Sequence, residues 1–162
     1  MVGLTTRQNT DLATRMERRE AILQLEAMLL ETPGATVGDS PLAPLNHLFC
    51  EGMYVRQIFL PKGVFGTGMI HKHAHPSFVL TGDVGVFTEE EGYSRIIAPK
   101  CFISQPGTKR VVYAYADTIW VTVHLNPDNE QDPRALREMN VTDNYNEIEP
   151  SIVEALWHSQ ES

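Results

Sequence analysis

The chain has 162 residues, of which 42% are apolar and 21% charged, a balance typical of a folded globular domain. Thirteen lysines and arginines face twenty-one acidic residues, which gives a formal net charge of −8. This balance argues against non-specific binding to nucleic acid and against docking on an anionic membrane, because both require a cationic surface.

The cysteines and the N-terminal sequence bear on where the protein works. Cys50 and Cys101 have the spacing of neither a disulfide framework nor a zinc-thiolate site, so we expect two reduced thiols. No run is long and apolar enough to span a bilayer, and residues 1–7 lack the pattern of a signal peptide. We therefore expect the protein to stay in the cytoplasm in which it is made.

Residues 1–48 are predicted to form a helical arm. A helix is expected over 11–31, because Asn9 or Thr10 can cap it and a Thr-Pro-Gly sequence follows it. The second half of this helix carries an apolar stripe that must be buried, either on the protein's own domain or on another subunit. The stripe comprises Ile22, Leu25, Met28 and Leu29. Residues 32–48 are rich in proline and glycine and are predicted to be an extended linker.

Residues 49–126 are predicted to form the main domain, with many short strands separated by turn residues. So many strands without room for helical crossovers predict an antiparallel β-sandwich or barrel and exclude a parallel sheet. Turns are expected at 81–83 and 116–117, and a solvated hairpin loop is expected at 89–92. The predicted strands are 53–60, 64–70, 77–80, 83–88, 93–97, 101–104, 110–115 and 118–124.

The remaining residues, 127–162, are predicted to form an acidic tail with short helices. Asp132 and Pro133 are a good cap and first residue for a helix that runs to about Arg137. Ser151 and Glu154 have the spacing of a capping box, which predicts a second helix over 152–158. The apolar residues of this second helix, like those of the first, need a partner surface, so we expect a homo-oligomer.

The most informative segment is the histidine-rich stretch of residues 66–82. If it is one strand, His71, His73 and His75 share a face, and two adjacent imidazoles could chelate Fe, Mn, Ni or Zn. The outer pair would be about 13 Å apart along an ideal strand, so at most two would bind one ion. Replacing His73 by alanine should therefore lower metal content most, since His73 belongs to either adjacent pair.

The same segment resembles the first motif of the cupin superfamily: a glycine, a His-x-His pair and an apolar strand that ends in a Val-Leu-x-Gly turn. The second cupin motif, a Pro-Gly turn before a strand, is similar to residues 106–110. This resemblance implies an antiparallel cupin-type β-barrel, or jelly roll, over about 53–124. The stretches YVRQIFLPKG and PGTKRVVYAYADTIWVTVH also resemble a family of small cupin-like proteins of tailed bacteriophages and prophages, which implies a viral origin.

Two departures from the cupin metal set count against catalysis. The glutamate expected a few residues after the second histidine is missing from 77–80, and Arg110 stands where the family has a further histidine. Arginine cannot ligate a metal, whereas it can bind a carboxylate or phosphate. His124 could replace a ligand, but if Tyr115 and Thr118 pair across a turn, His124 faces Lys109 and points outward.

Three functions remain open on the sequence. The favoured one is a non-enzymatic structural or interaction module that forms a homo-oligomer and serves as a capsid, connector or tail accessory of a virion. The second is a metal-dependent enzyme, of dioxygenase or isomerase type, that uses His71, His73 and His75. The third is a small-molecule or host-protein binder that acts against bacterial defence, with Arg110 holding an anion. No catalytic residue is assigned, no cofactor beyond a divalent metal is expected, and the site of action would be the host cytoplasm or the virion.

Overall fold

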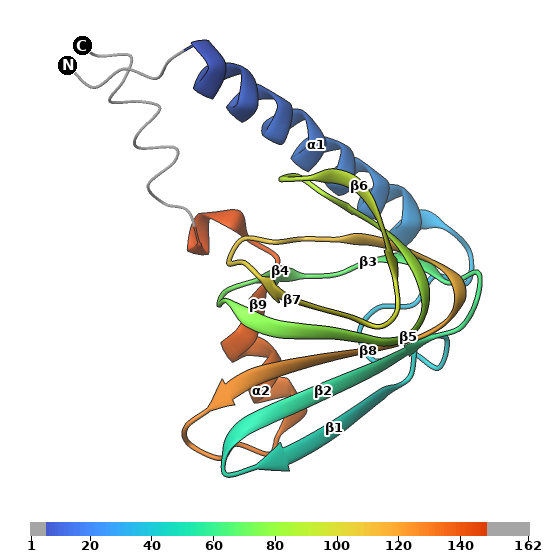
Figure 1. The fold of residues 1–162 in the computed structure, drawn as a ribbon, viewed down its shortest axis with the longest axis vertical. Coiled ribbons are helices and arrows are strands. Elements are labelled where there is room, and N and C mark those ends of the chain that lie inside the picture. Colours follow the sequence, from blue (N-terminus) through green and yellow to red (C-terminus); the bar gives the residue numbers. More distant parts are fainter. Residues whose placement is uncertain (1–5, 149–162) are drawn as a thin grey trace, which may run out of the picture.

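The computed structural model describes residues 6–148, which form an antiparallel β-barrel with a long helix along its side (Figure 1). The helices and strands are α1 (Thr6–Glu31), β1 (Leu45–Cys50), β2 (Gly52–Leu60), β3 (Phe65–Thr67), β4 (Ile70–His71), β5 (His75–Thr88), β6 (Gly92–Ile97), β7 (Lys100–Ser104), β8 (Val111–Asn126), α2 (Pro133–Asn140), β9 (Val141–Thr142) and the 3-10 turn η1 (Tyr145–Glu147).

The main sheet runs in the order β1-β2-β8-β5-β6, while β3 also pairs with β8 and β7 with β5. Every pairing in it is antiparallel, and β4 and β9 form a small second sheet. The antiparallel barrel predicted from the sequence is therefore confirmed. Strand β1 was not predicted: it begins at Leu45, within the stretch expected to be a linker, and pairs along its whole length with β2.

The two longest strands, β5 and β8, each run through a predicted turn. Strand β5 continues across 81–83, where its pairing with β8 shifts register three times, and Gly82 takes a φ of 96°. Strand β8 continues across 116–117 in the same irregular region. Extra residues bend a long strand and increase its twist without ending it. The predicted turns at 81–83 and 116–117 are therefore wrong, because these residues form bulges.

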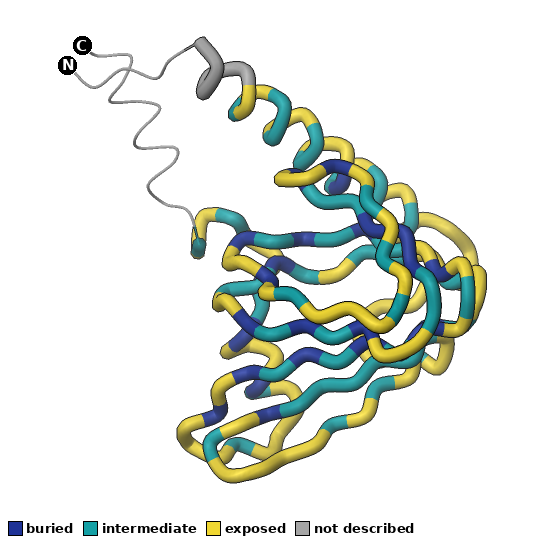
Figure 2. Tube along the Cα trace, in the orientation of Figure 1, coloured by how far each residue is buried: buried dark blue, intermediate teal, exposed yellow. Residues whose placement is uncertain are grey.

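The core lies between the bent strands, on the inner face of the barrel. Val79, Val84, Val86 and Trp120 are buried there and are packed by half-buried neighbours that include Ile58 and Phe102. Buried and exposed residues alternate along the strands, as Figure 2 shows. This alternation is the period of two that a strand imposes on its side chains. The side of each residue therefore follows from its position along the strand, except in β5, where the register shifts between Val79 and Val84 reverse the alternation.

Helix α1 packs on its own barrel. Of the two partner surfaces that the sequence allowed for its apolar stripe, the protein's own domain is therefore one that the stripe uses. Ile22 is 1% exposed and Leu25 is half-buried, but Met28 is 66% exposed and does not join them. At one end of the docked segment, Glu26 forms an ion pair with the buried Lys109. At the other end, Arg15 and Arg19 reach the β5–β6 hairpin.

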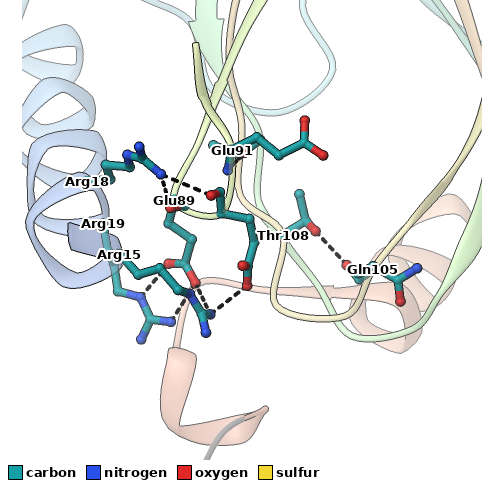
Figure 3. Close-up of polar contacts among 9 residues, drawn as sticks. Arg15, Arg18, Arg19, Glu89, Glu91, Gln105 and Thr108 are labelled. Carbon is teal, nitrogen blue, oxygen red and sulfur yellow. Dashed lines mark hydrogen bonds and ion pairs between the residues drawn. The ribbon is translucent and has the colours of Figure 1, made fainter. Parts of the chain in front are cut away.

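The hairpin tip was predicted to be solvated, and for Glu89 this is wrong. Its side chain is only 2% exposed and accepts hydrogen bonds from Arg15 Nη2 at 2.8 Å and Arg19 Nε at 2.6 Å (Figure 3). Arg18 donates to the backbone oxygens of Glu89 and Glu90. Burial raises the pKa of the Glu89 carboxyl, but the bonds from Arg19 and Arg15 outweigh it and hold the pKa below its usual value. Glu89 is therefore a charged anchor for α1.

Beyond the barrel, the predicted helix after Asp132 is confirmed as α2. Asp132 caps it by accepting a hydrogen bond from the backbone N–H of Arg134 at 3.0 Å, and Leu136 of this helix is fully buried. The helix predicted over 152–158 lies outside the described residues. No helix within residues 6–148 is long and apolar enough to cross a lipid bilayer.

Candidate functional site

The histidine-rich segment is not one strand. Strand β4 ends at His71 and β5 begins at His75, so the chain turns between them. Hydrogen bonds from His71 N to Thr108 O and from Gly107 N to His71 O hold the end of β4 against the loop before β8. The turn brings the rings of His71 and His75 to a centroid distance of 4.4 Å, while His73 is exposed and lies outside this pair.

A third imidazole, that of His124 on β8, completes the cluster. Its centroid lies 4.5 Å from that of His75, and its side chain is buried. The outward position predicted for His124 is wrong, because it assumed a turn at 116–117. Along an uninterrupted β8, even-numbered residues share the inner face, so His124 lies with Val112 and Trp120 and opposite Tyr54 of β2.

The environment keeps these imidazoles neutral. Burial, with smaller contributions from neighbouring histidines and arginines, lowers the pKa of His71 to about 2 and that of His124 to about 3. Burial also lowers the pKa of His75. His75 Nδ1 lies 3.0 Å from the carbonyl oxygen of His73, which can only accept, so Nδ1 carries the proton. His75 Nε2 therefore has a free lone pair, and both this atom and His71 Nδ1 are buried without a partner.

Arg110 lies beside the histidines, immediately before β8. Its Nη2 donates to Ser104 Oγ at 2.8 Å, and Ser104 Oγ in turn lies 2.7 Å from Ser77 Oγ. The guanidinium carbon is 5.6 Å from the ring centroid of Trp120, within the range of a cation–π contact. Burial lowers the pKa of Arg110 to about 10, so it is charged at neutral pH.

Arg56 brings a second cation to the inner face. It lies on β2 directly opposite Thr122 of β8, and residues opposite one another in an antiparallel pair project to the same face. Burial lowers its pKa from the usual value. Its charge is close enough to lower the pKa of both His71 and His124. Among the described side chains, neither Arg56 nor Arg110 has a carboxylate oxygen within 4.0 Å, although Asp39 is near enough to raise the pKa of Arg56 and Glu91 that of Arg110.

Tyr54 and His47 form a layer behind the cluster. The Tyr54 ring stacks between those of His124 and His47, at centroid distances of 5.9 and 5.8 Å. The Tyr54 hydroxyl is 2.7 Å from His47 Nδ1. Tyr54, Arg56 and His124 were not predicted as site residues, although the period of two along β2 would have placed Tyr54 and Arg56 on one face.

A divalent metal, which the resemblance implies, would have to bind at this cluster. The unpartnered nitrogens of His71 and His75 are suitable donors. However, no group of three or more His, Cys, Asp or Glu side chains in the described part of the chain is arranged to hold an ion. The neighbouring charges are also cationic, which opposes a dication. The described residues as placed therefore do not fit a divalent metal.

A cavity lies elsewhere, between α1 and the barrel. It has a volume of about 340 Å³, and its wall is apolar and aromatic. None of the histidines or inner-face arginines contributes to it, so its size alone does not identify it as the reactive site. Residues at its wall include Leu25, Phe65, Tyr93 and Tyr113.

No family model matches the sequence, and no curated protein matches it. Solved structures of similar shape are distant in sequence. An RmlC-like cupin from Shewanella frigidimarina is 18% identical over 54% of this chain and 78% of its own, with a TM-score of 0.44. KdgF from a Halomonas species is 15% identical over 60% of this chain and 88% of its own, with a TM-score of 0.48.

One larger protein of similar shape is the salicylate 1,2-dioxygenase of Pseudoaminobacter salicylatoxidans. It is 12% identical over 69% of this chain and 32% of its own, with a TM-score of 0.49. At these identities and TM-scores the likeness assigns neither a family nor a reaction to this chain. The strand pairings of the chain itself show an antiparallel β-barrel preceded by an N-terminal helix.

Proposed function

We propose that this protein binds a small anionic molecule at the inner-face cluster, with a phosphate or carboxylate group held between Arg56 and Arg110. One observation carries the proposal: two inner-face arginines without a carboxylate partner stand beside three neutral imidazoles. A cation removed from water costs free energy unless an opposite charge offsets it. An anionic ligand would supply that charge.

The donors around the cluster suit such a ligand. A guanidinium presents its N–H groups in a planar fork that matches the oxygens of a carboxylate or phosphate. The free lone pair of His75 Nε2 can accept a hydrogen bond from a hydroxyl group of the same ligand. We therefore expect a ligand that carries a hydroxyl near its anionic group.

This proposal develops the third function left open by the sequence and places it ahead of the structural module. The metal-dependent enzyme is its principal rival, because two unpartnered imidazole nitrogens also suit a metal. A place in a virion rests on the resemblance alone. Assembly with other copies of the chain is compatible with ligand binding and is a separate proposal, supported by exposed apolar side chains at the β1 edge, such as Leu48 and Phe49. Light scattering that reports a strict monomer would contradict it.

Isothermal titration with inorganic phosphate at constant ionic strength tests the binding proposal. Phosphate should bind the unchanged protein, and Arg110→Gln or Arg56→Gln should weaken binding roughly 10- to 100-fold, because a hydrogen bond to a charged group contributes about 1.5–3 kcal/mol. Arg134→Gln is the matched control, since Arg134 is exposed on α2 and loses the same charge. Equal affinity in all four proteins, or no phosphate binding by the unchanged protein, would contradict the proposal.

A further inference from the structure

One carboxylate oxygen of helix α1 contacts both β3 and the residue before Arg110. Glu26 Oε1 accepts a hydrogen bond from Lys109 Nζ at 2.8 Å and another from Thr67 Oγ1 at 2.7 Å. Lys109 is 2% exposed, whereas the Glu26 side chain is 30% exposed. The buried ammonium of Lys109 therefore has its countercharge on α1.

The two residues that Glu26 holds are neighbours of Arg110, one along the chain and one through strand pairing. Lys109 precedes it in the chain, and Thr67 is paired with Val111, which follows it. The backbone is tied at the same point, because Gly68 N donates to the carbonyl oxygen of Arg110 at 2.8 Å. The side chain of Arg110 then extends to Ser104 on the inner face.

We propose that Glu26 is a positioning residue for Arg110, so that α1 is part of the ligand site although it lies outside the barrel. Without this carboxylate, Lys109 would be a buried cation with no partner and would move toward solvent. The backbone that joins Lys109 to Arg110 would move with it, and the Arg110 guanidinium would lose its hydrogen bond to Ser104. The inference rests on the proposed anion site and adds a residue to it.

If Glu26 positions Arg110, its removal should change anion affinity in the direction opposite to the one expected from charge alone. Glu26 is negative and close to a cationic site, so removing its charge alone should strengthen anion binding. If Glu26 positions Arg110, its removal should weaken binding instead. Glutamine at position 26 keeps an oxygen that can accept hydrogen bonds from Lys109 and Thr67. Glu26→Gln should therefore keep part of the anion affinity that Glu26→Ala loses.

The experiment measures phosphate affinity on folded protein at constant ionic strength. Glu26→Ala should bind phosphate at least about fivefold more weakly, the lower end of typical coupling between sites, and Glu26→Gln should fall between it and the unchanged protein. Two controls should keep full affinity: Glu20→Ala, which removes an exposed carboxylate of α1, and Glu89→Gln, which loosens the opposite end of the docked helix.

A second measurement without phosphate separates this inference from the proposed function. The guanidinium of Arg110 lies over the Trp120 ring, so its displacement should shift the Trp120 indole N–H resonance in a nitrogen-15 NMR spectrum. That shift should appear in Glu26→Ala and not in Glu20→Ala. An unshifted resonance, or affinity equal to or tighter than that of the unchanged protein, would overturn the positioning role. A shifted resonance in a protein that never binds phosphate would overturn the proposed function alone.

Discussion

The imidazole rings of His75 and His124 lie 4.5 Å apart, although one residue begins β5 and the other lies near the end of β8. These strands run antiparallel, so the start of one meets the end of the other. The contact places two neutral imidazoles beside a charged Arg110. This contact requires β8 to continue through the bulge at 116–117, because a turn there would place His124 on the outer face.

The histidine cluster should make the protein sensitive to acid. The unfolded chain takes up protons on its histidines near pH 6.5, whereas folded His71 does so only near pH 2. Between these values the unfolded state binds more protons, so the free energy of unfolding should fall as pH is lowered and stay unaffected by these groups well above pH 6.5. His71→Gln should remove about 1.4 kcal/mol per pH unit from this slope.

Denaturant unfolding at several pH values between 3 and 8 measures that slope. His73→Gln is the control, because His73 is exposed and outside the cluster, and it should leave the slope as it is. Identical slopes for the His71 variant and the unchanged protein would mean that His71 is not buried as described.

The anchor at Glu89 should contribute measurably to stability. Glu89→Gln removes the charge that Arg15 and Arg19 share, so it should lower the free energy of unfolding by about 1–3 kcal/mol. Glu91→Gln should change it little, since Glu91 is exposed at the same hairpin. Chemical denaturation checks both, and similar effects of the two substitutions would show that Glu89 is solvated as the sequence had predicted.

The bulge in β5 depends on Gly82. Its φ of 96° suits glycine, and a Cβ there would overlap Thr118 Oγ1 and lie 2.5 Å from the carbonyl oxygen of Asp117. Gly82→Ala should therefore cost roughly 2–5 kcal/mol from backbone strain and overpacking together. Gly63→Ala is the control: its φ is 88°, but no atom lies within 4 Å of the added Cβ, so strain of about 1–2 kcal/mol is all it should cost.

Metal analysis distinguishes the anion site from the rival enzyme. Protein purified without a histidine tag should contain well under one equivalent of Fe, Mn, Ni or Zn, because cationic side chains stand beside an incomplete ligand set. Near one equivalent of metal, lost in His75→Ala, would contradict this and favour the metal-dependent enzyme.

The sequence predicted the features that local chemistry decides. The capping pair at Asp132 and the density of short strands each depend on a few neighbouring residues, and both predictions are confirmed. The side on which His124 lies depends on whether 116–117 form a turn or a bulge, and the same polar residues suit both. Pairing with β2 and β5, far away in the sequence, makes that choice. The burial of Glu89 is equally non-local, because its partners are on α1.

A crystal structure of the protein soaked with tungstate, a heavy analogue of phosphate, shows directly whether an anion binds at the inner-face cluster. We expect an anomalous peak on the inner face within hydrogen-bonding reach of both Arg56 and Arg110, and its loss in crystals of Arg110→Gln. An inner face without such a peak, at a tungstate concentration that saturates binding in solution, would contradict anion binding by the two arginines.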